Sequence, residues 1–354
     1  MLDVRLTSRI CLATDGSLRD GTGEARALPP ELVVLTALSP DWQPLASLSA
    51  AGFPAWQIER LFQAGIVDVG RGRFCTPRRA RAYFEEQFPE QAAERPFATW
   101  LTAPLPRVLW LGLPYTNLAR LAHSTAVGLA AILATASPAT IPVFGVLPDE
   151  APSTRVHEDL EDLVGLTAEL GLRLGIIGGD HRATWSMLRT VKSAMPGKPV
   201  QYIHVDAHHD LYGYRPDRPP DRVNHANFLA DLLQRGCVDR AVLIGRRDGA
   251  EPLRAALDEG LPIDLSATGD AWQPADWNDD AYTHLSVDLD ILDPRWAPAV
   301  SSPIEEGWTP DALIRTLANI MGETRIDSCS VVEAGGGDQA TTEAALTVIE
   351  LLGI

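Results

Sequence analysis

The 354-residue sequence has few cysteines, a shortage of positive charge and no long apolar run. Its four cysteines show no Cys-x-x-Cys spacing, which fits free or buried thiols in a reducing compartment rather than a disulfide framework. With 30 lysines and arginines against 47 acidic residues, the formal net charge of -17 argues against nucleic acid or an anionic membrane as the main partner. No apolar run reaches membrane-spanning length, and the start lacks the apolar core of a signal peptide. We therefore expect a cytoplasmic protein that binds neither nucleic acid nor membranes.

A proline-rich joint at 102–106 separates two patterns of sequence. Beyond the joint, short apolar runs that predict strands alternate with helical stretches. The predicted strands are 108–111, 141–146, 172–177, 200–205, 241–244, 282–287 and 328–332, and the clearest helices are 160–170, 226–234 and 311–320. This alternation predicts a three-layer α/β domain over 105–354, with helices on both faces of a mostly parallel sheet.

Residues 1–104 show a different order, in which helices precede a hairpin. Apolar residues follow helical spacing at 29–38, 44–50 and 54–64, and two short runs at 66–69 and 73–76 flank a Gly-Arg-Gly turn. This order resembles a small winged-helix domain. The third helix carries Arg60 as its only cation, which is too little charge to follow a phosphate backbone. Peptide binding or packing is therefore at least as well supported as DNA binding.

Polar side chains follow the ends of four predicted strands. They are His181 in Gly-Gly-Asp-His, the cluster Asp206-Ala-His208-His-Asp210, the pair Asp288 and Asp290, and Glu333. Parallel sheets bind ligands at the carboxyl ends of their strands. We therefore expect these groups to meet in one polar site.

Six of these residues form a candidate metal-ligand set without cysteine. They are His181, Asp206, His208, Asp210, Asp288 and Asp290. Oxygen-rich ligation with a minority of imidazole favours manganese over structural zinc. One member alone could be a helix cap or a core histidine, but the set would repel itself without cations. We expect two metal ions that share the carboxylates of Asp206 and Asp288. His204 and His209 either support the ligands or pack in the core, and the sequence does not decide between these two roles.

The three ligand segments resemble those of the ureohydrolase family of arginases and agmatinases, in residue type, order and separation. Leu111-Gly-Leu-Pro-Tyr115 and Leu243-Ile-Gly-Arg-Arg247 extend the resemblance over about residues 107 to 354. It implies an arginase-like fold and two Mn²⁺ ions, one held by His181, Asp206, Asp210 and Asp288, the other by Asp206, His208, Asp288 and Asp290. It also implies hydrolysis of a guanidino group to urea and an amine, with Glu333 facing the guanidinium and Asp210 or His225 passing a proton to the leaving nitrogen.

The sequence departs from this family in two places. Arg182 follows His181 where the family has serine, and residues 211–222 lack the Asn- and Ser-rich loop that grips free arginine. The favoured substrate is therefore an arginine side chain in a precursor peptide, captured by residues 1–104 through β-augmentation, as in peptide arginases. Agmatine or another small guanidine is the alternative. A one-zinc deacetylase and a non-enzymatic metal-binding regulator are rival functions, and the oligomeric state is left open, a homo-oligomer included.

Overall fold

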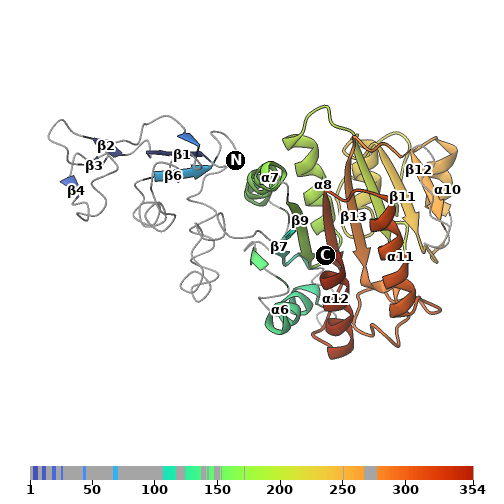
Figure 1. Cartoon of the computed structure of the whole chain (residues 1–354). Coiled ribbons are helices and arrows are strands. Elements are labelled where there is room, and N and C mark those ends of the chain that lie inside the picture. Colours follow the sequence, from blue (N-terminus) through green and yellow to red (C-terminus); the bar gives the residue numbers. More distant parts are fainter. Residues whose placement is uncertain are drawn as a thin grey trace. The chain divides into compact units, whose positions relative to one another are not determined.

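The chain divides into two compact units, Met1–Leu105 and Pro106–Ile354. In the second unit the computed structural model describes residues 107–116, 124–136, 141, 143–146, 152, 154–170, 172–249, 251–266 and 277–353. In the first unit it describes six short strands between residues 3 and 70 (Figure 1).

The described strands of the first unit form two antiparallel sheets. β1 (Asp3–Leu6) lies between β5 (Gln43–Pro44) and β6 (Val67–Gly70), while β2 (Ile10–Leu12), β3 (Leu18–Asp20) and β4 (Ala25–Arg26) form the other sheet. β6 coincides with the first run of the predicted hairpin. Its predicted partner at 73–76 and the predicted helices lie outside the described residues, apart from Pro44, which ends β5. The winged helix therefore stays a prediction.

The second unit contains an eight-stranded sheet in which every neighbouring pair is parallel. The strands are β7 (Val108–Leu113), β8 (Val143–Val146), β9 (Arg173–Gly178), β10 (Val200–Val205), β11 (Arg240–Ile244), β12 (Ile263–Ser266), β13 (Tyr282–Asp288) and β14 (Ser328–Val332). Their order is β12-β11-β10-β13-β14-β9-β7-β8. The predicted α/β architecture is confirmed, and the seven predicted strands are present. β12, which the sequence analysis missed, is a short edge strand with Asp264 and Leu265 exposed.

Helices cover both faces of this sheet (Figure 1). They are α6 (Thr125–Thr135), α7 (Thr154–Leu170), α8 (Arg182–Ala194), α9 (Phe228–Gln234), α10 (Glu251–Asp258), α11 (Pro310–Glu323) and α12 (Gln339–Leu352), with a short 3-10 helix, η4, at Leu289–Ile291. α8 packs against α7 and α9, and α12 packs against α6 and α11. No helix among the described residues is long and apolar enough to cross a membrane.

Local sequence explains where the two C-terminal helices begin. Thr309 caps α11 by accepting a hydrogen bond from the amide of Ala312, and Pro310 occupies the first turn, where its missing N–H costs nothing. Asp338 caps α12 in the same way, by accepting from the amide of Thr341. These caps end the loops that follow β13 and β14, and thereby limit the freedom of the polar residues at those strand ends.

The four strands that precede the candidate ligands are adjacent in the sheet. β10, β13, β14 and β9 follow one another in the strand order, so their carboxyl ends meet along one edge. All residues of β10, β13 and β14 are buried, because helices cover both faces of the sheet. The sheet therefore brings together His181 and Glu333, which lie 152 positions apart in the sequence.

Candidate metal centre

His181 is positioned by a tight crossing of the chain just after β9. The amide of Gly179 donates to the carbonyl of Leu113, and the amide of Asp180 donates to the carbonyl of Tyr115, at 2.6 and 2.7 Å. A Cβ at Gly179 would lie 1.7 Å from the Tyr115 carbonyl oxygen, so only glycine allows this approach. The crossing places His181 immediately before α8 at the edge of the sheet.

The two ring nitrogens of His181 have different surroundings. Nδ1 lies 3.1 Å from Asp288 Oδ2, 3.2 Å from Asp210 Oδ2 and 3.3 Å from Asp206 Oδ2. Nε2 lies 3.0 Å from the hydroxyl of Ser286. The tautomer with its proton on Nε2 donates to Ser286 and leaves the Nδ1 lone pair among carboxylate oxygens, where a cation is the partner that satisfies all of them.

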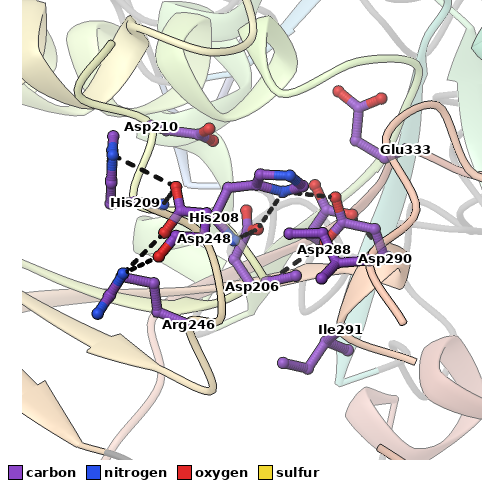
Figure 2. A network of polar contacts seen from close by, with 12 residues as sticks. Asp206, His208, His209, Asp210, Arg246, Asp248, Asp288, Asp290, Ile291 and Glu333 are labelled. Atoms are coloured by element: carbon purple, nitrogen blue, oxygen red, sulfur yellow. Dashed lines mark hydrogen bonds and ion pairs between the residues drawn. The ribbon is translucent and has the colours of Figure 1, made fainter. Parts of the chain in front are cut away.

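Backbone amides hold one oxygen of three aspartates and leave the other facing an imidazole. Oδ1 of Asp206 accepts from the amide of His208 (2.6 Å), Oδ1 of Asp288 from the amide of Asp290 (2.8 Å), and Oδ1 of Asp290 from the amide of Ala207 (3.2 Å). Oδ2 of Asp290 lies 2.9 Å from Nδ1 of His208, as Figure 2 shows. The carboxylates are thus fixed in place before any ligand binds.

Burial makes the charges at this centre costly. The aspartates are at most 5% exposed, and burial raises the pKa of Asp206, Asp210 and Asp288 well above the ordinary value. Burial also opposes a charge on His208, but the carboxylates of Asp206 and Asp290 raise the pKa of this histidine to about 11. The site therefore favours positive charge among its carboxylates.

The donor set fits divalent cations. The carboxylates of Asp206 and Asp290 and a nitrogen of His208 can share one ion, and so can the groups of His181, Asp288 and Glu333. Oδ2 of Asp206 is buried without a hydrogen-bond partner among the described residues. The six candidate ligands supply four carboxylates and two imidazoles and no thiolate, which is the ligand chemistry that hard or borderline ions prefer.

Two acidic residues at the site have left-handed backbone conformations. Asp210 has a φ of 51° and Glu333 a φ of 65°, which residues other than glycine rarely adopt. Oε1 of Glu333 accepts the amide of His181 at 2.9 Å, and Oε2 accepts the hydroxyl of Ser301. Burial and the charge of Asp180 raise the pKa of Glu333 to about 7. The strained backbone turns both carboxylates toward the metal centre.

A cavity of about 220 Å³ opens over these groups. Its lining comprises His181, His208, Asp210, Tyr212, His225, Ala226, Asp288, Asp290, Ser301, Ser302 and Glu333. The three residues proposed from sequence for proton transfer and substrate binding, Asp210, His225 and Glu333, all line it. Burial lowers the pKa of His225. Of the six candidate ligands, Asp206 alone is absent from the lining.

The role of His204 was undecided from sequence, and Ser286 and Ser301 were not predicted as site residues. Nε2 of His204 lies 3.2 Å from Asp206 Oδ2, and its Nδ1 lies 2.7 Å from the hydroxyl of Tyr202. His204 can share an ion with His181 and Asp206. The alternation of side chains along β10 puts His204 on the same face as Asp206, and this signal could have identified it.

Three arginines near the centre are engaged by the protein. Arg182 donates to both carboxylate oxygens of Asp180 and to the carbonyl of Thr116. Arg246 donates to Asp248, and Arg247 donates to backbone carbonyls that include that of Asp290. None of the three lines the cavity. Arg182 therefore braces Asp180 and the loop after β7.

Comparison with known proteins decides the family. A model of the Arginase family matches residues 137–352. The chain belongs to the arginase family. Similar family members include an agmatinase of Chromobacterium violaceum, 28% identical over 167 residues that cover 46% of this chain and 50% of the relative. Another is an N(1)-aminopropylagmatine ureohydrolase of Thermus thermophilus, 28% identical over 200 residues that cover 52% of this chain and 63% of the relative.

A solved structure shares the arginase-like fold. The arginase from Medicago truncatula superimposes with a TM-score of 0.58 at 22% identity, covering 78% of this chain and 94% of that one. Together with the family match, this likeness confirms the arginase-like fold expected for residues 105–354. The chain spans about half the length of the curated relatives it first matches.

Proposed function

We propose that the protein is a dinuclear manganese hydrolase that splits a guanidino group into urea and an amine. Its six ligands are His181, Asp206, His208, Asp210, Asp288 and Asp290, with Asp206 and Asp288 shared by both ions. The observation that carries the proposal is the orientation of Nδ1 of His181 toward three buried carboxylate oxygens at 3.1, 3.2 and 3.3 Å. Such a group of buried acids is stable only around positive charge.

The residues around the cavity divide the remaining tasks among themselves. Bound manganese would supply Lewis acidity and lower the pKa of a water molecule. Glu333, held by the His181 amide and Ser301, offers a carboxylate to the planar guanidinium and so orients its central carbon. Asp210 accepts a proton from the attacking water and passes it to the leaving nitrogen, either directly or through His225.

We further propose that the guanidino group is carried by an arginine side chain in a peptide, which leaves as ornithine. Free arginine would bring a carboxylate that needs a cation, yet Arg182, Arg246 and Arg247 are engaged and do not line the cavity. The chain has a separate unit, Met1–Leu105, and under this proposal that unit would bind the precursor peptide.

Mass spectrometry of an arginine-containing precursor peptide tests this substrate. Incubation with the manganese-loaded protein should remove roughly 42 Da per arginine, the mass of the CN₂H₂ unit lost when arginine becomes ornithine. Asp288→Asn, which keeps the size of the side chain, should abolish the change while the protein stays folded by circular dichroism. Urea release from agmatine with no change in any peptide would overturn the peptide assignment.

Agmatine or a related small guanidine is the second candidate substrate. Its support is the naming of similar family members as an agmatinase and an N(1)-aminopropylagmatine ureohydrolase. The ratio of kcat/KM for agmatine to kcat/KM for an arginine peptide separates the two substrates. The peptide proposal requires a ratio below one.

Metal stoichiometry distinguishes this hydrolase from a one-zinc deacetylase. A deacetylase would need one Asp-x-His pair and one later aspartate, and would leave His181, Asp210 and Asp290 without a task. Elemental analysis after loading and gel filtration should give about two manganese ions per chain for the proposed ligand set. A single zinc ion per chain, retained against excess manganese, would contradict the dinuclear proposal.

A further inference from the structure

Tyr212 combines exposure with a position on the cavity wall. The large apolar or aromatic side chains exposed among the described residues are Val127, Tyr212, Leu265 and Trp296. Tyr212 is 40% exposed, and it is the member of this group that lines the cavity over the metal centre. An aromatic face that stays open to solvent beside a polar site has apolar surface left for a ligand.

Tyr212 is nevertheless held at three points, two on its side chain and one on its backbone. Its hydroxyl donates to Oδ2 of Asp248 at 3.0 Å, and its ring centroid lies 4.5 Å from that of His209. The backbone amide of Tyr212 donates to the carbonyl of Ala226 at 3.0 Å, which ties it to the segment that carries His225. The ring can therefore meet a ligand without the loss of rotamer freedom that an exposed side chain normally pays.

A brace made of His209, Asp248 and Arg246 holds the hydroxyl of Tyr212 through Asp248. Asp248 is nearly buried; its Oδ2 also accepts the amide of His209 at 3.1 Å, and its Oδ1 accepts Nη1 of Arg246 at 3.0 Å. His209 is fully buried. Figure 2 shows His209, Asp248 and Arg246 joined beside His208, and none of the three lines the cavity. The brace thus lies outside the candidate ligand set and meets the cavity through Tyr212.

We propose that Tyr212 determines substrate specificity, because its fixed ring forms the wall against which the aliphatic arm of the guanidino substrate packs. This inference rests on the proposed function, which places the guanidinium beside Glu333 and leaves the arm to pass the other cavity walls. An aromatic face covers methylene groups well and carries no charge that would select a carboxylate. The favoured ligands are guanidines with an alkyl arm, as in agmatine and peptide arginine, over bare guanidine.

Calorimetric titration of the manganese-loaded full chain with two ligands tests the wall. Butylguanidine has the arm, and guanidine lacks it. Tyr212→Ala should weaken butylguanidine binding roughly ten-fold, which corresponds to about 1.4 kcal/mol, and should leave guanidine binding unchanged. Tyr212→Phe keeps the ring without the hydroxyl and should retain most of the affinity. Manganese content measured on each variant shows that the centre itself is intact.

Three outcomes would overturn the inference. Tyr212→Ala could weaken the binding of both ligands equally, or it could weaken neither. The wild-type chain could also bind butylguanidine no more tightly than guanidine, since no arm contact would then exist. The proposed function fails separately. A chain that shows the expected effect of Tyr212→Ala on binding but releases no urea would support the role of Tyr212 and contradict the hydrolase proposal. Urea release together with unchanged ligand binding by Tyr212→Ala would contradict the role of Tyr212 alone.

Discussion

Replacement of Glu333 by glutamine should alter how the stability of the metal-free protein depends on pH. Glu333 is 3% exposed, and burial together with Asp180 raises its pKa from 4.5 to about 7. The folded state therefore prefers the protonated acid. The contribution of protonated Glu333 to the free energy of unfolding is fully present below pH 4.5 and is lost as the pH rises through 7. Glutamine has nearly the same shape and does not titrate.

The expected size of the effect follows from the two pKa values. As the pH rises from about 5.5 to about 7.5, the titration of Glu333 should lower the free energy of unfolding by about 2 kcal/mol, since one pKa unit corresponds to about 1.36 kcal/mol. The assay is urea denaturation of both proteins after removal of metal by a chelator. Over this pH range the free energy of unfolding of the wild type should fall by about 2 kcal/mol more than that of Glu333→Gln.

Two results would refute this reasoning. Identical pH dependence of the two proteins would mean that Glu333 is not buried with a raised pKa. A wild type that gains stability relative to Glu333→Gln as the pH rises would mean that the carboxylate already has a cationic partner within the protein. The comparison uses two chains that differ in one side chain, so the titration of the neighbouring aspartates is largely common to both.

Two further predictions concern the support of the site. Ser286→Ala should lower manganese affinity by ~10 to 100-fold, because Nε2 of His181 loses its partner, and unchanged affinity in a metal titration would exclude this role. Gly179→Ala should destabilise the fold by about 3 kcal/mol or more, because the new Cβ would overlap the carbonyl of Tyr115. In thermal denaturation Gly322→Ala is the matched control, since it meets open space in α11 and should be neutral or stabilising by about 0.5 kcal/mol; equal Tm values for both variants would contradict the clash.

The strands were predictable from sequence where the sheet is buried on both faces. β10, β13 and β14 lie between two layers of helices, so each strand is one continuous run of buried residues. β12 has one neighbour in the sheet and exposes Asp264 and Leu265, so it carries no such run. The predicted helices at 160–170 and 311–320 lie within α7 and α11, and the helix predicted at 226–234 begins two residues before α9.

The positions of the candidate ligands were predictable because the segments that carry them lie at or just after the carboxyl ends of strands in a parallel sheet. Contacts made by loops were not. Tyr212 and Asp248 meet across 36 residues, and Ser301 and Glu333 meet across 32, through packing that no local pattern encodes. The left-handed backbone of Asp210 was equally hidden, because such conformations usually belong to glycine.

Urea measurement tests the central claim most directly. The manganese-loaded protein is incubated in parallel with agmatine, an arginine-containing peptide and an acetyl-lysine peptide, and urea and acetate are both quantified. The proposed function predicts urea from at least one guanidino compound, no acetate, and loss of urea release after chelation or in Asp288→Asn. Acetate from the acetyl-lysine peptide, or a fully metal-loaded protein that yields no urea from either guanidino compound, would contradict it.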